Sequence, residues 1–310
     1  MSEFLALFTT AFFAAAIRMA TPLILGGIGG TFSERSGILY LGVEGTMLIG
    51  ACVAAIVSFF TNSAWLGVLG GMAIGALVGL LHAFMCIRFK ANQTVIGTGI
   101  NIMAMGVTPL LLEALWDSPG TSPTVPGISP ISIPGLVNIP ILGDIIGTHS
   151  PLTFIALILV PVATFVLFKT KAGLRIRAVG ENPLAADTLS VNVFRVQYMS
   201  VMVCGIMAGL AGSYLSLCQV SMFVKGMTAG RGFMSLAVMI FGKWKPTGVL
   251  LGALLFGFAE SLEISMQTAG WGVPTDILLS IPYVITILVL AGFVGKAVAP
   301  KQVGKPYIKQ

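Results

Sequence analysis

Long apolar runs fill most of this chain, and short polar stretches separate them. A helix needs roughly 20 mostly apolar residues to cross the hydrocarbon core of a bilayer, which is about 30 Å thick. The runs have that length. Because hydrophobic residues make up 56% of the chain and charged residues only 9%, the sequence cannot provide the polar surface of a soluble protein. We therefore predict an all-α, polytopic helix bundle embedded in a lipid membrane.

The runs predict about eight to ten transmembrane helices in a single domain that covers residues 1–310. Their approximate ranges are 5–28, 38–60, 64–87, 93–116, 151–168, 196–218, 231–242, 247–266 and 276–295. The run at 231–242 is short enough to be a half-helix. The motifs at 67–71 (GVLGG) and 248–252 (GVLLG) each open a Gly/Ala/Leu-rich span, which indicates either an internal repeat or a chance match in low-complexity sequence.

Glycines in two of these spans have the spacing that favours close helix packing. Gly71, Gly75 and Gly79 recur every four residues, as do Gly205 and Gly209, so each set leaves a smooth groove on one helix face. This pattern predicts a tight bundle and a dimeric pore. The glycines at 26–30 are not followed by the lysine of a phosphate-binding loop, and we interpret them as a helix break at a membrane edge.

Basic residues predict the orientation of the chain, because Lys and Arg in short loops stay on the cytoplasmic side. They cluster at 88–90, in the loop at 169–195, at 243–245 and in the tail from Lys296. The Pro/Gly-rich linker at 117–150 contains no Lys or Arg, so we place it outside the cytoplasm and the tail inside. Lys225 and Arg231 are exceptions on the expected outer side. This bias accounts for the net charge of +6 without a nucleic-acid partner.

The sequence lacks the motifs of catalysis and metal binding. It has no phosphate-binding loop, no G-x-S-x-G elbow and no H-E-x-x-H helix, and its sparse acids and histidines suggest no nucleophile paired with a base. The four cysteines have no paired spacing, and the two histidines, His82 and His149, are far apart. No catalytic residue, metal or cofactor is predicted, and this chain does not itself hydrolyse ATP.

Ionisable and amide side chains at membrane depth are the candidate functional groups, since burying a charge near the bilayer centre costs about 2.5 to 3.5 kcal/mol. Glu44 is flanked by glycines in the sequence GVEG, and Asn101 follows a glycine by one helical turn. Glu260 and Glu263 are three residues apart, hence on one helix face. The alternative is that these groups pair with arginines or backbone inside the protein and only specify packing.

The largest block of charge lies in the loop at 169–195, between two apolar runs. Asn182 and Pro183 are a good helix start, with Asn as N-cap and Pro at the first helical position, and residues 184–190 can form about two turns. Ala185 and Ala186 keep this helix slim, which suits it to a cleft in another subunit. An ordinary interfacial amphipathic helix is the alternative, although its few apolar side chains would anchor it weakly.

Five segments together resemble one protein family. They are Gly173–Asp187 (GLRIRAVGENPLAAD), Phe32–Gly37 (FSERSG), Gly42–Gly45 (GVEG), Gly230–Met234 (GRGFM) and Phe241–Pro246 (FGKWKP). With the tail Ala299–Tyr307 (APKQVGKPY), they resemble the permease subunit of bacterial ABC importers for simple sugars and branched-chain amino acids. The resemblance runs nearly end to end and is strongest to the nucleoside-type branch, whose binding protein is a basic membrane lipoprotein.

The resemblance implies a multi-pass protein of the bacterial inner membrane with three partners: a separate ATPase subunit, a second permease that completes a heterodimer, and an extracytoplasmic binding lipoprotein. The ATPase would bind residues 180–192 as a coupling helix, and its closure would rock the permeases between inward and outward states. The implied coupling residues are Gly180, Glu181, Asn182, Pro183, Ala185, Ala186, Asp187 and Leu189. Related permeases have Gly-Ile or Gly-Val after this helix, whereas this chain has Ser190-Val191.

For the substrate pathway, the resemblance points to Glu44, Asn101, Phe233 and Glu260, the last often Gln in relatives. A carboxylate or amide would hydrogen-bond ribose hydroxyls and Phe233 would stack on a base, so the expected substrate is a nucleoside, purine first, or a related simple sugar. The site should bind weakly, because an importer must release its substrate. The competing hypotheses are an ion-coupled secondary transporter or channel, with Glu44 and Glu260 as proton carriers, and a structural membrane scaffold.

Overall fold

The computed structural model describes residues 9–133, 142–268 and 298–309, together with residues 135, 139, 277, 280 and 284. Within these residues the protein is a bundle of α-helices with one pair of very short strands. Seven of the described helices are long and apolar enough to cross a membrane. The predicted all-α, polytopic fold is therefore confirmed. The expected span at 276–295 lies outside the described residues, apart from 277, 280 and 284.

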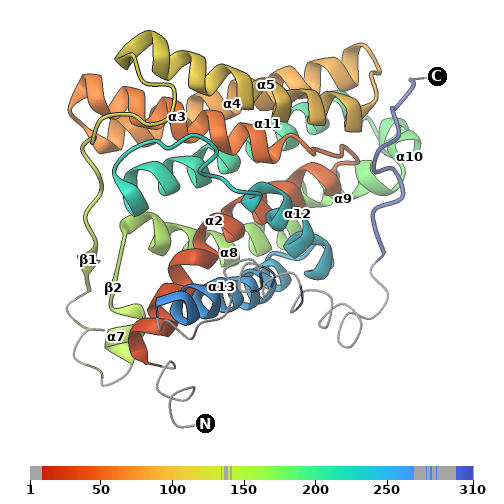
Figure 1. Ribbon diagram of the computed structural model, residues 1–310. Coiled ribbons are helices and arrows are strands. Elements are labelled where there is room, and N and C mark those ends of the chain that lie inside the picture. The colour runs from red at the N-terminus through yellow and green to blue at the C-terminus, as the bar shows by residue number, and fades with distance from the viewer. Residues whose placement is uncertain are drawn as a thin grey trace.

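The long helices are α2 (Thr10–Arg35), α3 (Val43–Thr61), α4 (Ala64–Arg88), α5 (Gln93–Trp116), α8 (Pro151–Lys169), α11 (Val193–Tyr214) and α13 (Pro246–Thr268). The shorter elements are α7 (Leu142–Ile146), α9 (Lys171–Glu181), α10 (Pro183–Thr188), α12 (Arg231–Phe241), the π-helical turn η1 (Leu215–Val220) and the antiparallel strands β1 (Ile131–Ser132) and β2 (Thr148–His149). In the centre of the bundle, α11 packs against α2, α3 and α4, and α2 also packs against α8, α12 and α13 (Figure 1).

The glycine pattern predicted for close packing is confirmed at the contact between α4 and α11. A Cβ atom on Gly75 would overlap the carbonyl oxygen of Gly205, and one on Gly209 would overlap that of Gly71. Gly79 packs in the same way on Val201, where a Cβ would lie 2.9 Å from the carbonyl oxygen. The two backbones therefore touch along several turns, the contact that small residues allow in membranes. This contact lies within one chain, so it builds the bundle itself.

The helix break predicted at 26–30 is wrong, because α2 continues through these residues to Arg35. Each glycine there faces a different neighbour: a Cβ on Gly26 would clash with Ser235 of α12, and one on Gly27 with Val249 of α13. On the other side, a Cβ on Gly29 would lie 3.1 Å from the Cys204 carbonyl oxygen of α11. The glycines thus cost helix propensity, about 1 kcal/mol each relative to alanine, but allow three helices to approach α2 closely.

The two ends of the bundle carry different elements (Figure 1). We call the end with α9, α10 and residues 298–309 the tail end, and the end with α7, β1 and β2 the linker end. The basic clusters at 88–90, 243–245 and 305–309 meet at the tail end: Arg88 and Lys90 share a pocket wall with Tyr307, and Arg35 donates to the Lys243 and Trp244 carbonyls. This arrangement is the one that the positive charges predict.

The first part of the Pro/Gly-rich linker runs alongside η1 and the residues that follow it. The backbone N–H groups of Ser122, Val125 and Ile128 donate to the carbonyls of Phe223, Ser221 and Leu217, at 2.8 to 2.9 Å. These carbonyls lie in and just after η1, where the π-helical turn leaves them without partners in the helix. The linker therefore satisfies backbone groups that would otherwise be unpaired at membrane depth.

Candidate functional site

The helical structure is interrupted between α2 and α3, at residues 36–42, and we call this segment the break. Side chains form hydrogen bonds with the backbone groups that have no helical partner there. The N–H of Leu39 donates to Gln93 Oε1 at 2.7 Å, and its carbonyl oxygen lies 3.1 Å from His82 Nε2. Ser33 Oγ donates to the Ile38 carbonyl at 2.7 Å. Irregular backbone within a membrane protein requires such partners. The segment just before Glu44 is thus a break between two helices that is hydrogen-bonded within the chain.

Asn101 belongs to the same network and is 8% exposed. Its Oδ1 accepts from the N–H of Gly45 at 2.8 Å, and its Nδ2 donates to the Leu41 carbonyl at 3.0 Å. A Cβ on Gly45 would lie 2.7 Å from the Cα of Asn101, so only glycine permits this approach. Asn101 therefore joins the end of the break and the first turn of α3 to α5.

Glu44 joins α3 to α12. Its Oε1 accepts from the N–H of Gly230 at 2.9 Å and its Oε2 from the N–H of Gly232 at 2.6 Å. A carboxylate that accepts from the free N–H groups at a helix N-terminus is stabilised by both the hydrogen bonds and the helix dipole. Gly232 packs so tightly on the backbone of Glu44 that a Cβ would overlap it. Glu44 thus acts as an N-cap supplied from another helix.

Arg231 and Glu260 form an ion pair between α12 and α13, in which Nη2 of the arginine meets Oε1 of the carboxylate. Both side chains are largely buried, at 17% and 13% exposure. The pair explains why Arg231 is an exception to the charge pattern: it neutralises an intramembrane acid. Phe233, in the first turn of α12, is 49% exposed.

These groups lie near the middle of the bundle. Asn101 is about 12 Å from the start of α5, by the helical rise. The predicted half-helix is α12, whose 11 residues span about 16 Å, roughly half of a hydrocarbon core. Its far end is fixed at the tail end, because Trp244 Nε1 donates to Glu34 Oε2 at 2.6 Å. The N-termini of α3 and α12 therefore meet at half depth, and we call Glu44, Asn101, Arg231, Phe233 and Glu260 the mid-membrane site.

At the tail end, the helix start predicted in the loop at 169–195 is confirmed. Asn182 Oδ1 accepts from the N–H of Ala185 at 3.1 Å, and Pro183 is the first residue of α10. The helix is shorter than the predicted 184–190, since it ends at Thr188 and Ser190 has a positive φ of 61°. That backbone conformation favours glycine, so it accounts for the glycine of related permeases where this chain has Ser190.

The predicted coupling residues divide into two sets. Glu181, Asn182, Ala185 and Leu189 are exposed, whereas Gly180, Pro183 and Ala186 are buried. Asp187 is half-buried and accepts from the Tyr307 hydroxyl at 3.0 Å. Burial and this hydrogen bond to Asp187 raise the pKa of the Tyr307 phenol, so it remains a donor at neutral pH. The exposed set forms a ridge that faces away from the bundle, and the buried set anchors it.

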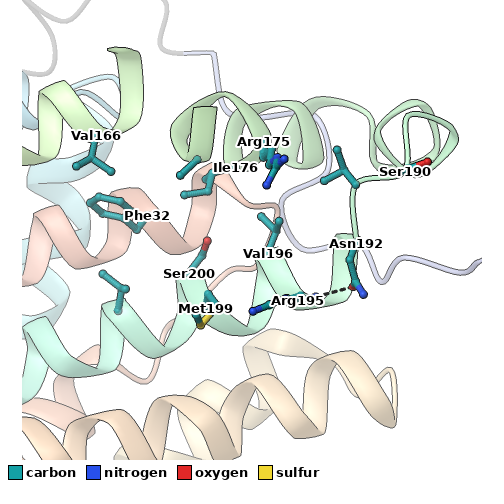
Figure 2. Close-up of a pocket in the computed structure, with 13 residues that line it drawn as sticks. Phe32, Val166, Arg175, Ile176, Ser190, Asn192, Arg195, Val196, Met199 and Ser200 are labelled. Carbon is teal, nitrogen blue, oxygen red and sulfur yellow. Dashed lines mark hydrogen bonds between the residues drawn. The ribbon is translucent and has the colours of Figure 1, made fainter. Parts of the chain in front are cut away.

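A pocket of about 620 Å³ lies between α9 and the segment 190–192 on one side and α2, α8 and α11 on the other. Figure 2 shows Phe32 of α2 and Val166 of α8 on one side, Arg175 and Ile176 of α9 above, and the first turns of α11 below. The segment 190–192, which joins α10 to α11, closes one end of the pocket. The pocket therefore separates part of the loop at 169–195 from α11, and the loop contacts the bundle on either side of the pocket.

Sequence reasoning missed the role of four participants in these sites. Arg231 was treated only as a misplaced positive charge, although its spacing from Phe233 places it on α12. Gln93 and His82, which satisfy the break, appeared as isolated polar residues. Tyr307 had no pattern that predicted its contact with Asp187, because 120 residues separate them. No group of three or more His, Cys, Asp or Glu side chains that could hold a metal occurs in the described part of the chain.

A broken helix, a half-helix with its N-terminus at mid-depth, and a capped helix that projects at the basic end define a membrane permease. The family model for the permease component of the branched-chain amino acid transport system matches residues 12–290. This chain belongs to that family, and it is a multi-pass transport subunit of the bacterial inner membrane.

Three curated relatives indicate where in the family the chain lies. It is 42% identical to the guanosine ABC transporter permease protein NupQ of Bacillus subtilis, over 95% of both chains. It is 42% identical to the nucleoside ABC transporter permease protein NupC of Lactococcus lactis, over 94% of both. The putative glucose ABC transporter permease protein TsgC13 of Haloferax volcanii is 36% identical over 82% of this chain and 77% of its own. No solved structure matches this chain.

Proposed function

We propose that this chain is the permease subunit of an ATP-driven importer of nucleosides, with purine nucleosides as the preferred substrates. The observation that carries this proposal is the projecting helix α10, whose exposed face is made of small and apolar residues. A carrier driven by an ion gradient needs no such helix. The names of the guanosine and nucleoside relatives, which align over almost the whole chain, support the substrate.

In this proposal residues 1–310 form one membrane domain, with 117–150 as an extracytoplasmic linker and 169–195 as a cytoplasmic coupling loop. A separate ATPase subunit binds the exposed ridge of α10. A second permease, different in sequence, completes the pore, and an extracytoplasmic lipoprotein delivers the substrate. The exposure of Phe233 beside the buried polar core of the mid-membrane site supports a pathway on that face of the bundle.

Within the pathway, we assign two different roles to the four candidate residues. Phe233 presents its ring to the substrate, since a base can stack on an exposed aromatic face with a gain of about 1 to 3 kcal/mol. Glu44, Asn101 and Glu260 hold the N-termini of α3 and α12 in place, because their hydrogen bonds run to backbone or to Arg231. In the described part of the chain, Oε2 of Glu260 and Nε of Arg231 are buried without a hydrogen-bond partner, and we assign them to the ribose hydroxyls.

A chain of contacts supports coupling between α10 and the mid-membrane site. Gly180, at the end of α9, packs directly on the carbonyl of Arg35 at the end of α2. The Phe168 ring lies under the guanidinium groups of Arg35 and Arg177, 5.5 Å and 5.1 Å from its centroid. From Arg35 the chain continues into the break and then into Glu44. A displacement of α10 therefore moves the segment that carries the mid-membrane site.

The test is uptake of radiolabelled guanosine, adenosine, uridine, ribose and glucose into vesicles that contain this chain with its ATPase, second permease and binding protein. We expect guanosine and adenosine to enter only with ATP, and uptake to persist with an uncoupler. Uptake of ribose or glucose alone would reject the nucleoside substrate. Uptake that ignores ATP and collapses with the uncoupler would instead support the ion-coupled carrier.

A further inference from the structure

The tail at residues 298–309 is held against α10 by contacts with both ends of the coupling region. At one end, the backbone N–H of Gln302 donates to the Gly180 carbonyl at 3.0 Å. At the other, Tyr307 donates to Asp187 at 3.0 Å. Between these contacts, the tail and the start of α10 line a shared pocket, to which the tail contributes Gln302, Pro306, Tyr307 and Ile308. It therefore spans α10 from before its N-cap to its last turn.

Tyr307 is buried, at 6% exposure, although it lies three residues from the end of the chain. Its ring centroid is 5.4 Å from that of Phe194 in the first turn of α11. With Val179, Ala186 and Val193 it forms a small apolar core that is separate from the core of the bundle. Ordering this segment costs conformational entropy, and the burial of the Tyr307 ring offsets part of that cost.

The same tail also contacts the break between α2 and α3. Gly37 has a positive φ of 92°, and a Cβ there would lie 3.3 Å from the side chain of Gln302. The residue whose N–H binds Gly180 thus also covers the first residues of the break. The tail therefore touches both the helix that projects from the bundle and the segment that leads to Glu44.

The exposed side chains of this assembly are basic and apolar, with Glu181 as an acid on the ridge of α10. Lys301, Lys305 and Lys309 are exposed along the tail, next to the exposed Leu184 and Leu189 of α10. Ile308 adds a further exposed apolar side chain, at 59%. A partner that fits it has an apolar groove with an acidic rim.

We propose that α10 and the tail together form one composite docking surface for the ATPase subunit, in which Tyr307 is the positioning residue that fixes α10 to the tail and to α11. This inference rests on the proposed function and extends it to the tail, which lies outside the predicted coupling helix. When the ATPase moves α10, the tail makes α10, the end of α9 and the break move as one unit.

The experiment measures two quantities on the complete complex in vesicles: binding of the ATPase to the permease pair, and nucleoside molecules transported per ATP hydrolysed. Three variants are compared. Tyr307→Phe removes only the hydroxyl, Tyr307→Ala also removes the ring, and Leu110→Ala is the control, since Leu110 is 68% exposed on α5, outside the proposed docking surface. The amount of permease in the membrane is measured for each.

We expect Tyr307→Ala to weaken ATPase binding by about tenfold or more, the loss that follows from removing a buried aromatic side chain. Tyr307→Phe should lower the transport yield per ATP by about twofold to tenfold, the range for one hydrogen bond, with little change in binding. Leu110→Ala should match the wild type in both. A lower yield per ATP at unchanged permease level is an effect that a merely stabilising residue would not produce.

Wild-type binding and yield in Tyr307→Ala would overturn the inference and leave the proposed function intact. If Tyr307→Ala does not reach the membrane, Tyr307→Phe and Asp187→Ala decide the question, since both keep the ring, and full yield in both would overturn it. If the wild-type permease binds no ATPase, the proposed function fails and the inference falls with it. If the ATPase binds and Tyr307 matters but nucleosides do not enter, only the substrate assignment fails.

Discussion

The mid-membrane site and the tail end use their polar groups in opposite ways. In the mid-membrane site, both oxygens of Glu44 and both ends of the Asn101 amide are hydrogen-bonded within the chain. At the tail end, α10 leaves Leu184 and Leu189 exposed to the surroundings. The hydrogen bonds of Glu44 and Asn101 are complete in a single chain, whereas α10 presents groups that gain from a partner.

This difference predicts different consequences of mutation. Removing a group from the mid-membrane site leaves buried backbone N–H groups unpaired, which costs stability in the isolated permease. Removing an exposed group from α10 costs the permease little, but lowers its affinity for the subunit that covers it. The predictions that follow test this contrast, from the largest expected effect to the smallest.

Gly232→Val should have the largest effect. The new side chain would overlap the backbone and carboxylate of Glu44, which cannot move away without losing its bonds to α12. Overpacking of this kind costs about 3 kcal/mol or more. We expect little folded permease in detergent and no uptake. The control is Gly106→Ala on α5, because no atom lies within 4 Å of its Cβ position and its backbone is helical; normal folding of Gly232→Val would show that α3 and α12 need not touch.

Leu189→Asp should abolish productive binding of the ATPase. Leu189 is 79% exposed on the ridge of α10, and placing a charge where an apolar contact is expected costs several kcal/mol. We expect at least a hundredfold loss of affinity, measured by titration of the ATPase onto permease in nanodiscs. Asn62→Asp, at an exposed position between α3 and α4, should bind normally. Equal affinities would place the ATPase elsewhere.

Glu44→Ala should lower uptake more than Glu44→Gln. Alanine leaves the N–H groups of Gly230 and Gly232 without acceptors, whereas glutamine keeps one carbonyl oxygen for them. Each charge-assisted bond is worth about 1.5 to 3 kcal/mol. We expect a loss of about tenfold to a hundredfold for alanine and less for glutamine in the vesicle uptake assay. Full uptake in Glu44→Gln together with Asn101→Ala would reject the mid-membrane site as part of the pathway.

Ser190→Gly should have the smallest effect, and a favourable one. Ser190 has a φ of 61°, a conformation that costs a residue with a side chain about 1 kcal/mol relative to glycine. We expect unchanged or slightly higher thermal stability and normal uptake. Ser190→Val should lower stability instead, because a β-branched residue is less compatible with this backbone. A stabilising effect of valine would contradict the geometry at the end of α10.

The sequence predicted those parts of the fold that depend on patterns along the chain. Run length predicted the spans, charge predicted which loops share an end, and the glycines at 71, 75 and 79 predicted a close helix contact. The cap at Asn182 was predictable because it depends on two adjacent residues. The internal repeat suggested by the two GVL motifs stays a prediction.

The failures concern contacts between distant segments. The glycines at 26–30 have the pattern of a break, and only the three helices packed against them reveal why they are helical. The polar residues of the mid-membrane site were identified, but not their partners: Glu44 meets Gly230 and Gly232, nearly 190 residues away in the chain. Local sequence carries no signal for such pairings.

The most direct test of the contrast is to measure thermal stability and ATPase binding on the same preparations of Glu44→Ala and Leu189→Asp permease. We predict that Glu44→Ala lowers the Tm of the isolated permease by about 5 °C or more, the shift for a loss of about 3 kcal/mol. Leu189→Asp should keep the wild-type Tm and lose ATPase binding. A wild-type Tm for Glu44→Ala, or normal ATPase binding by Leu189→Asp, would contradict the division between an internally complete site and a partner-dependent end.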